Sequence, residues 1–223
     1  MTGRSWHLSQ GLQDYLIAHA SPPDEVLDGL AAETARRFPG PSGMQIGPDQ
    51  GALMTLLTRL TGVRSAVEVG TFTGYSAICI ARGLAEGGKL TCCDVSEDWT
   101  SLAREYWQRA GLADRIELRL GPALDTLRAL PPGPHLDLAF IDADKTGYVG
   151  YWDEIVPRIR PGGILVIDNV NWYLPCRSKA PNSRTAELGP ATDVWAAVWQ
   201  QLAGWRTIWT SSGVWDTAIF IRS

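Results

Sequence analysis

Short apolar runs alternate with stretches of helical periodicity along this chain, and no other feature constrains its fold as strongly. A short apolar run between helices is typical of a strand buried on both faces of a parallel sheet, and the crossovers between such strands are right-handed. We therefore predict an α/β fold with a doubly wound, mostly parallel sheet. The expected strands span residues 66–69, 89–94, 116–120, 136–142 and 163–168, and the helices between them span 75–83, 100–110, 123–130 and 148–156.

Both ends of the chain extend this pattern. Helices are expected at 8–20 and at 24–38, where Asp24 caps the second one. After a loop at 39–47, a third helix at 48–61 carries leucines on one face, namely Leu53, Leu56, Leu57 and Leu60.

The last part of the chain is expected to close the sheet. After a helix at 193–202, two strands near 205–210 and 217–221 are joined by a short connection, so one of them should run antiparallel. The full prediction is a seven-stranded Rossmann-like sheet with an antiparallel closing strand and extra N-terminal helices.

Composition narrows the class of protein. The chain has 223 residues, is 45% hydrophobic and 20% charged, and carries a net charge of −4. We expect one globular domain over 1–223, with 1–47 as a helical lead that serves as a lid or dimer segment. The lack of a basic stripe argues against nucleic acid and anionic membranes, and the lack of a leader or spanning run favours a cytoplasmic protein. The four cysteines form no CxxC pair and are expected to be reduced thiols.

A glycine loop at residues 70–74 follows the first strand and opens a helix. Its spacing is G-x-x-x-G, not the G-x-G-x-x-G that brings a backbone close to a pyrophosphate, and Glu68 stands just before it. An acid there suits a ligand with a cationic amine. Asp94 ends the second strand, where an acid can bind both ribose hydroxyls. A ribose and an amine without phosphate indicate S-adenosylmethionine.

Two of the apolar strands end in acidic or amide side chains. Asp142 and Asp144 follow one strand, with Lys145 beside them, and Asp168 and Asn169 follow the next. The carboxyl ends of parallel strands meet at the edge where ligands bind. Oxygen ligands suit a hard divalent cation such as Mg²⁺, Mn²⁺ or Ca²⁺, so we expect Asp142, Asp168 and Asn169 to hold one. The alternative is that these residues only cap helices.

These segments resemble class I S-adenosylmethionine-dependent O-methyltransferases, and among them the cation-dependent group that includes caffeoyl-coenzyme A and catechol O-methyltransferases. The similarity runs from about Met44 to the C-terminus. It rests on residues 44–51, 68–76, 121–124 and 142–145, and on Asp94, Tyr148, Tyr151, Asp168 and Asn169.

The resemblance implies a role for each matching residue. Met44 and Ile46 would lie over the cofactor, Asp94 would bind its ribose, and Ala123 would meet its adenine. The methionine part would be held by Glu68, Gly70, Thr71 and Ser76, with Asp142, Asp144 and Tyr151 closing around it. Asp142, Asp168 and Asn169 are again the metal set, and Asp142 and Lys145 are the catalytic pair, with Lys145 as general base or as an electrostatic stabiliser.

The acceptor is expected to be a small aromatic molecule with vicinal hydroxyls. Residues 170–192 form a long loop after the metal strand, and Trp172, Tyr173 and Trp215 are candidates to wall the acceptor. The loop departs from the plant caffeoyl-coenzyme A pattern, which favours a free catechol-like acceptor. Only three of the 20 basic residues are lysines, which is typical of a high-GC bacterial gene and suggests natural-product biosynthesis.

Two other functions stay open at this point. One is an NAD(P)-dependent Rossmann reductase, against which the missing G-x-G-x-x-G counts. The other is a non-catalytic protein that binds S-adenosylmethionine, against which the set of acids with Lys145 counts. The resemblance also implies a homodimer.

Overall fold

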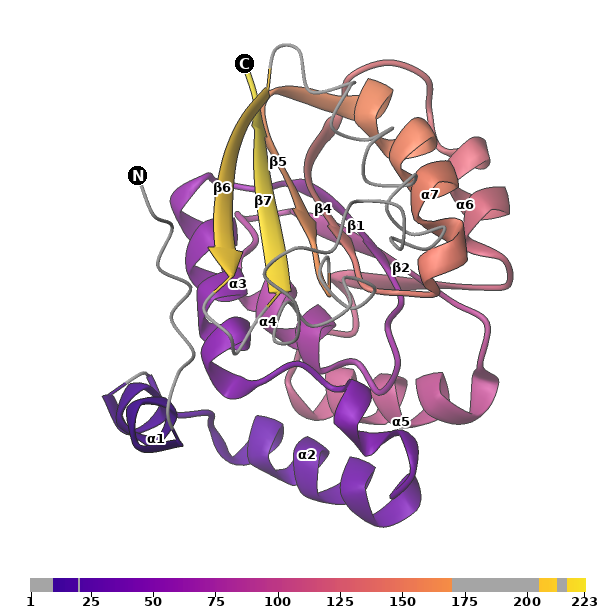
Figure 1. The fold of residues 1–223 in the computed structure, drawn as a ribbon. Coiled ribbons are helices and arrows are strands. Elements are labelled where there is room, and N and C mark those ends of the chain that lie inside the picture. Colours follow the sequence, from indigo (N-terminus) through magenta and orange to yellow (C-terminus); the bar gives the residue numbers. More distant parts are fainter. Residues whose placement is uncertain (1–9, 20, 170–204, 212–215) are drawn as a thin grey trace, which may run out of the picture.

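A computed structural model describes residues 10–19, 21–169, 205–211 and 216–223. Its centre is a seven-stranded sheet with the order β3-β2-β1-β4-β5-β7-β6 (Figure 1). The strands are β1 (Ser65–Val69), β2 (Lys89–Asp94), β3 (Ile116–Leu120), β4 (Leu136–Ile141), β5 (Ile159–Ile167), β6 (Trp205–Ser211) and β7 (Asp216–Arg222).

Helices cover both faces of this sheet. One hydrophobic core joins the sheet to α2, α3, α4 and α5, and a second core joins its other face to α6 and α7 (Figure 1). The α-helices are α1 (Gln10–His19), α2 (Glu25–Arg37), α3 (Pro48–Leu60), α4 (Tyr75–Gly83), α5 (Glu97–Arg109), α6 (Ala123–Ala129) and α7 (Tyr148–Ile155). Short 3₁₀ turns are η1 (Pro41–Met44), η2 (Lys145–Gly147) and η3 (Val156–Arg158).

Strand β4 shows why its sequence is apolar without interruption. Leu138 and Phe140 belong to the core on one face, whereas Ala139 and Ile141 belong to the core on the other. Every residue of the strand is buried. A strand covered by helices on both faces needs no alternation of polar and apolar residues.

The closing pair confirms the predicted topology. Strands β1 to β5 pair in parallel, and β7 runs antiparallel to β5 and to β6. Strand β7 therefore begins, rather than ends, at the edge of the sheet where the parallel strands end.

Several boundaries differ from the sequence prediction. Helix α5 begins at Glu97 because the side chain of Ser96 accepts a hydrogen bond from the backbone N–H of Trp99. Strand β5 begins at Ile159, and the loop predicted at 39–47 contains η1. The predicted helix at 193–202 lies outside the described residues.

Helix α3 buries only part of the face that carries its leucines, because Leu53 and Leu57 pack partly buried against the core and the other two do not. Gln50, Gly51, Met54 and Thr58 are buried, whereas Leu56 and Leu60 are 52% and 73% exposed. The physical reason is close packing on α4: a Cβ on Gly51 would lie 2.8 Å from Cys79 Sγ. Small residues let the two helices approach, which the leucine pattern alone does not indicate.

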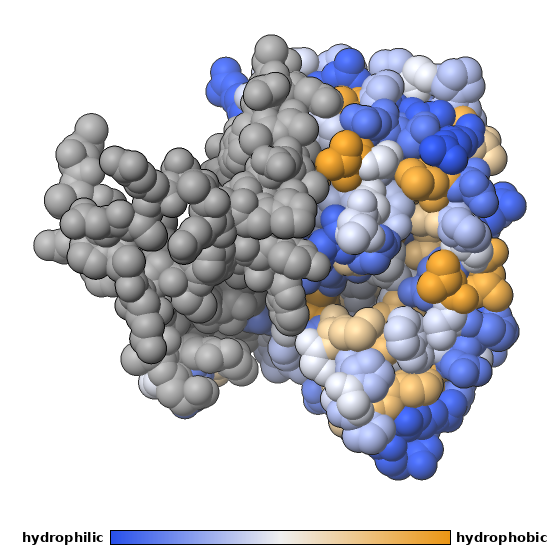
Figure 2. Space-filling view, turned by 45° about the vertical axis from the view of Figure 1, so that its right-hand side comes forward, coloured by the Kyte–Doolittle hydropathy of each residue, from blue (hydrophilic) through white to orange (hydrophobic). Residues whose placement is uncertain are grey.

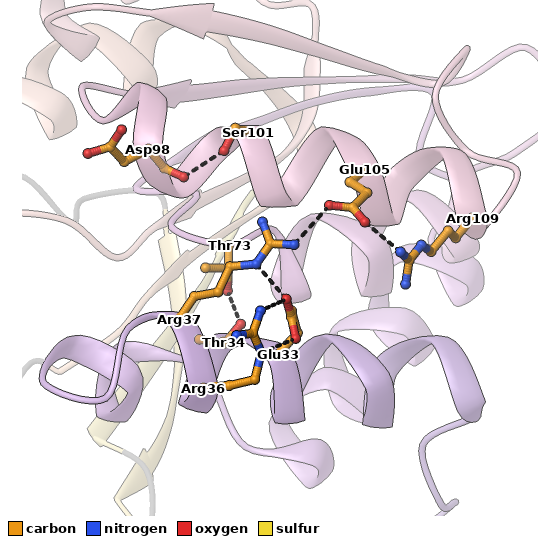
Figure 3. Close-up of polar contacts among 9 residues, drawn as sticks. All are labelled: Glu33, Thr34, Arg36, Arg37, Thr73, Asp98, Ser101, Glu105 and Arg109. Atoms are coloured by element: carbon orange, nitrogen blue, oxygen red, sulfur yellow. Dashed lines mark hydrogen bonds and ion pairs between the residues drawn. The ribbon is translucent and has the colours of Figure 1, made fainter.

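Helix α2 is fastened to the rest of the molecule by polar contacts (Figure 3). Arg37 pairs with Glu33 on its own helix and with Glu105 on α5, and these side chains are partly exposed to water. Ion pairs open to water contribute only ~0–1 kcal/mol each to the free energy of unfolding. The buried contact is a 2.9 Å hydrogen bond from Thr34 Oγ1 to Thr73 Oγ1, which ties α2 to the glycine loop.

The amino edge of the sheet has its own polar cluster. The Asp137 carboxylate accepts hydrogen bonds from the backbone N–H groups of Arg64 (2.6 Å) and Ser65 (2.9 Å), and it pairs with Arg160. These partners keep the pKa of Asp137 below its usual value despite burial, so the carboxylate stays ionised. The cluster joins β1, β4 and β5 at the edge opposite the strand ends that carry Asp142 and Asp168.

The described surface is of mixed polarity. Figure 2 shows hydrophobic residues scattered singly or in small groups among hydrophilic ones on the coloured part of that face. Within the described ranges, no helix combines the length and hydropathy that crossing a bilayer requires. Cys79, Cys92 and Cys93 are buried free thiols, as expected, and Cys176 lies outside the described residues.

Candidate active site

A cavity of about 1070 Å³ opens at the carboxyl ends of the parallel strands. It joins the glycine loop to the acid-ended strands β4 and β5. Of the predicted cofactor, metal and catalytic residues, all but Glu68 line it: Met44, Ile46, Gly70, Thr71, Ser76, Asp94, Ala123, Asp142, Asp144, Lys145, Tyr151, Asp168 and Asn169.

Both glycines of the loop are required by the backbone. Gly70 and Gly74 have φ angles of 89° and 88°, a region that residues with a Cβ rarely adopt. A Cβ on Gly74 would also lie 2.7 Å from Trp107 Nε1. The spacing G-x-x-x-G thus marks the two points at which the loop turns against its neighbours.

Asp94 holds this loop from the end of β2. Its Oδ2 accepts hydrogen bonds from the backbone N–H groups of Thr71 (3.0 Å) and Phe72 (2.8 Å), and its Oδ1 accepts one from Ser96 (2.8 Å). The side chain is 8% exposed and lines the cavity. A carboxylate has about four lone-pair positions, so three backbone bonds leave capacity for one more donor.

Glu68 lies beneath the loop and is fully buried. Its Oε2 accepts hydrogen bonds from Thr71 Oγ1 (3.1 Å) and Cys92 Sγ (3.3 Å), while its buried Oε1 has no hydrogen-bond partner in the described part of the structure. Burial raises the pKa of Glu68 to about 7, although the hydrogen bonds from Cys92 and Thr71 act to lower it. An orphaned carboxylate oxygen of this kind fits a nearby cationic group.

Aromatic and apolar side chains line the part of the cavity near Asp94. Trp99, on the first turn of α5, lines the cavity and packs edge-on against Phe72, with ring centroids 5.2 Å apart. Ile46 is buried and Met44, the last residue of η1, is half exposed, and both line the cavity. Ala123, the first residue of α6, also lines the cavity.

Asp144 and Tyr151 are in direct contact. The Tyr151 hydroxyl donates a 2.5 Å hydrogen bond to Asp144 Oδ1, and Asp144 Oδ2 accepts from the backbone N–H of Gly147 at 2.9 Å. Asp144 therefore caps η2 with one oxygen and holds Tyr151 with the other. Both residues line the cavity near the acid-ended strands.

Asp142, Lys145, Asp168 and Asn169 form one cluster. Lys145 Nζ lies 3.0 Å from Asn169 Oδ1 and 3.6 Å from Asp142 Oδ1, and it also donates to the Tyr148 hydroxyl. Asn169 adopts a φ of 53°, an uncommon conformation that asparagine tolerates better than most residues. The side chains of Lys145 and Asp142 are only 18% and 17% exposed, so water screens their charges weakly.

The electrostatics of this cluster favour an added positive charge. Burial, together with the nearby carboxylate of Asp168, raises the pKa of Asp142 to about 6. Burial lowers the pKa of Lys145, and the neighbouring acids Asp142, Asp168 and Asp144 oppose that shift. The carboxylates of Asp142 and Asp168 and the amide oxygen of Asn169 fit a divalent cation. Within the described ranges, no group of three or more histidine, cysteine, aspartate or glutamate side chains is arranged to hold a metal ion, so the third ligand here would be the amide.

Sequence reasoning missed several residues at this edge. Tyr148 was part of a matched motif without a role, yet its hydroxyl joins Lys145 to the backbone oxygen of Asp168 (3.1 Å). No local sequence pattern marks Trp99 or Thr217 as site residues, because the tertiary structure places them there. Trp99 lies on α5, which follows β2, and Thr217 lies on β7. The predicted acceptor residues Trp172, Tyr173 and Trp215 lie outside the described residues.

The fold and cavity fit an α/β enzyme of the methyltransferase class, and comparisons with known proteins identify the family. The O-methyltransferase family profile matches residues 18–187. Catechol O-methyltransferase domain-containing protein 1 of Mus musculus is 34% identical over 179 residues, 79% of this chain and 68% of its own. Catechol O-methyltransferase of Mycobacterium tuberculosis is 40% identical over 141 residues, 63% of this chain and 62% of its own.

A solved structure agrees in fold over nearly the whole chain. The O-methyltransferase TomG of Streptomyces achromogenes, involved in tomaymycin synthesis and solved with S-adenosylmethionine, has a TM-score of 0.79 at 27% identity and covers 98% of this chain and 97% of its own. The chain belongs to the O-methyltransferase family. It is an S-adenosylmethionine-dependent enzyme, which sets aside the reductase and the non-catalytic alternatives.

Proposed function

We propose that this enzyme methylates one hydroxyl of a catechol-like aromatic small molecule, with a divalent cation such as Mg²⁺ held by Asp142, Asp168 and Asn169. The observation that carries the proposal is the single cavity that joins the glycine loop to two close carboxylates, an amide and Lys145. The names of the catechol O-methyltransferase relatives support the acceptor class. A tailoring step in natural-product synthesis is the proposed setting.

Different residues of the chain would bind the cofactor and position the acceptor hydroxyl. The loop from Gly70, Asp94 and Glu68 would hold S-adenosylmethionine, with Met44, Ile46 and Ala123 around its nucleoside part. Positioning of a hydroxyl oxygen in line with the methyl group can account for ~7–11 kcal/mol of the barrier.

Lys145 is the proposed general base. Asp142, Asp168 and Asn169 would hold the cation, which would supply positive charge that lowers the pKa of a nearby acceptor hydroxyl. Burial already lowers the pKa of Lys145, so its Nζ would accept the proton of the acceptor hydroxyl. Lys145→Arg separates the two roles, because arginine keeps the charge but stays protonated. A large loss of kcat in Lys145→Arg supports proton transfer, and retention of kcat supports electrostatic stabilisation.

A methyl-transfer screen tests the function. Dihydroxybenzoates, dihydroxyanthranilates and flavonoid catechols would be assayed with Mg²⁺, with EDTA, and with EDTA followed by excess Mg²⁺. We expect turnover that EDTA abolishes and Mg²⁺ restores. Asp142→Asn should lose activity, whereas Asp153→Asn, an exposed acid on α7, should not. Full activity in EDTA would contradict the metal-dependent mechanism.

We further propose one domain over 1–223 that forms a homodimer. The exposed Leu56 and Leu60 on α3 support a contact with a second copy. The residues proposed to wall the acceptor are Trp172, Tyr173 and Trp215. Light scattering of the purified protein, and of Leu60→Glu, tests the dimer: a monomeric wild-type protein would contradict it.

A further inference from the structure

Asp168 is held by a hydroxyl from the antiparallel closing strand. Thr217 Oγ1 donates a 2.6 Å hydrogen bond to Asp168 Oδ1. The register explains the contact, since Ile167 pairs with Ala218 and the next residues outward are Asp168 and Thr217. Asp168 and Thr217 are 5% and 2% exposed, so this charge-assisted hydrogen bond lies away from water.

A second hydrogen bond extends this contact to helix α3. Gln50 Nε2 donates to Thr217 Oγ1 at 3.3 Å, and Gln50 is 4% exposed on the first turn of α3. The direction of both bonds is fixed by chemistry. An ionised carboxylate only accepts, so the single hydroxyl proton of Thr217 points to Asp168 and its oxygen accepts from Gln50.

The backbone of Asp168 is fixed on both sides. Its N–H donates to the carbonyl oxygen of Ile141 at 2.9 Å, and its own carbonyl oxygen accepts from the Tyr148 hydroxyl at 3.1 Å. With the main chain held, rotation of the carboxylate is the remaining freedom. Thr217 engages one carboxylate oxygen and thereby restricts which way the other oxygen points.

We propose that Thr217 and Gln50 are positioning residues that orient the Asp168 carboxylate for the divalent cation. The inference rests on the proposed metal set and extends it to two residues that would not touch the cation. Partners that orient metal ligands commonly change metal affinity by about 10- to 100-fold when they are removed. Because Gln50 lies on α3, the orientation of Asp168 also depends on the position of this helix. Helix α3 follows Met44 and Ile46 in the chain, and both of these residues line the cavity.

Calorimetric titration of Mn²⁺ into the full-length protein, without cofactor or acceptor, tests this inference. We expect Thr217→Val to bind Mn²⁺ about ten-fold or more weakly, because valine keeps the shape but lacks the hydroxyl. Thr217→Ser, which restores the hydroxyl, should bind within about two-fold of wild type. Thr58→Val is the matched control, since the buried Thr58 hydroxyl donates to Met54 O at 2.7 Å within α3.

The double variant tests the relay itself. If Gln50 acts through Thr217, Gln50→Leu should weaken Mn²⁺ binding, and Gln50→Leu/Thr217→Val should bind no more weakly than Thr217→Val alone. Equal Mn²⁺ affinity in Thr217→Val and wild type would overturn the inference and leave the proposed function standing. A wild-type protein that binds no Mn²⁺ would overturn the metal-dependent function and this inference with it.

Discussion

Gly70 lies directly against the backbone of Asp142. A Cβ on Gly70 would overlap the Asp142 carbonyl oxygen and lie 2.7 Å from its carbonyl carbon. This contact joins the glycine loop after β1 to the acid-ended turn after β4. The two halves of the proposed site, for the methyl donor and for the cation, are therefore set at a fixed separation by a residue without a side chain.

Gly70→Ala should destabilise the protein severely. The substitution combines a positive φ with a backbone overlap, whereas Gly111→Ala, also at positive φ, meets nothing within 4 Å. We expect Gly111→Ala to cost ~1–2 kcal/mol and Gly70→Ala at least ~3 kcal/mol more in the free energy of unfolding. Urea denaturation of both variants measures this difference, and equal costs would contradict the overlap.

Asp94→Asn should lower the free energy of unfolding even in the protein without ligand. An amide group in place of one carboxylate oxygen would face backbone N–H donors, and a buried donor without an acceptor costs ~1–3 kcal/mol. We expect a lower free energy of unfolding in the cofactor-free protein and a loss of S-adenosylhomocysteine affinity. Unfolding measured without cofactor, beside calorimetry, separates the two effects. Unchanged stability with lost affinity would mean that Asp94 serves only the ribose.

Glu68 should make stability fall as pH rises. Its pKa is raised from 4.5 to about 7 in the folded protein, so folding is unpenalised below pH 4.5 and increasingly penalised up to about pH 7. Asp142, raised from 3.8 to about 6, adds a loss of the same sign at lower pH. Glu68→Gln removes the first contribution, worth up to about 3 kcal/mol for a shift of this size.

Thermal unfolding between pH 5 and 8 checks this expectation. Glu68→Gln should gain Tm over wild type at pH 8 and lose that advantage at pH 5. Glu117→Gln, an exposed acid on β3, is the control and should follow wild type at every pH. Parallel curves for Glu68→Gln and wild type would show that burial of Glu68 carries no penalty.

Thr34 and Thr73 should behave as a coupled pair. Their hydroxyls share a 2.9 Å hydrogen bond, and both residues are almost fully buried, so each single change to valine leaves a polar atom without its partner. We expect each to cost ~1–2 kcal/mol, and Thr34→Val/Thr73→Val to cost clearly less than the sum. A double-mutant cycle from urea unfolding measures the coupling, and strictly additive costs would argue against it.

Local patterns in the sequence predicted much of this architecture. Runs such as 136–142 are apolar because both faces of the sheet are covered, and Asp24 caps α2 as expected, accepting from the backbone N–H of Leu27. The antiparallel closing strand followed from the length of one connection. These features depend on neighbours in sequence, so periodicity and capping chemistry are sufficient to predict them.

Features that depend on tertiary contacts could not be predicted in this way. Leu53, Leu56, Leu57 and Leu60 suggest one apolar stripe on α3. Leu53 and Leu57 pack against the core, but Leu56 and Leu60 are exposed because the close contact of Gly51 with Cys79 sets which face packs. Asp94 was assigned to a ligand, and its bonds to the loop backbone emerged only from the fold. Thr217 is 49 residues from Asp168 along the chain, and only the strand register brings the two together.

The Asp137 cluster has a consequence for how such an enzyme can change. Asp137 fastens β1, β4 and β5 at the amino edge, while Asp142 and Asp168 stand at the carboxyl edge of β4 and β5. Substitutions distant from one another and without shared partners tend to act independently. New acceptors can therefore be accommodated at one rim of the sheet while the anchor at the other rim remains as it was.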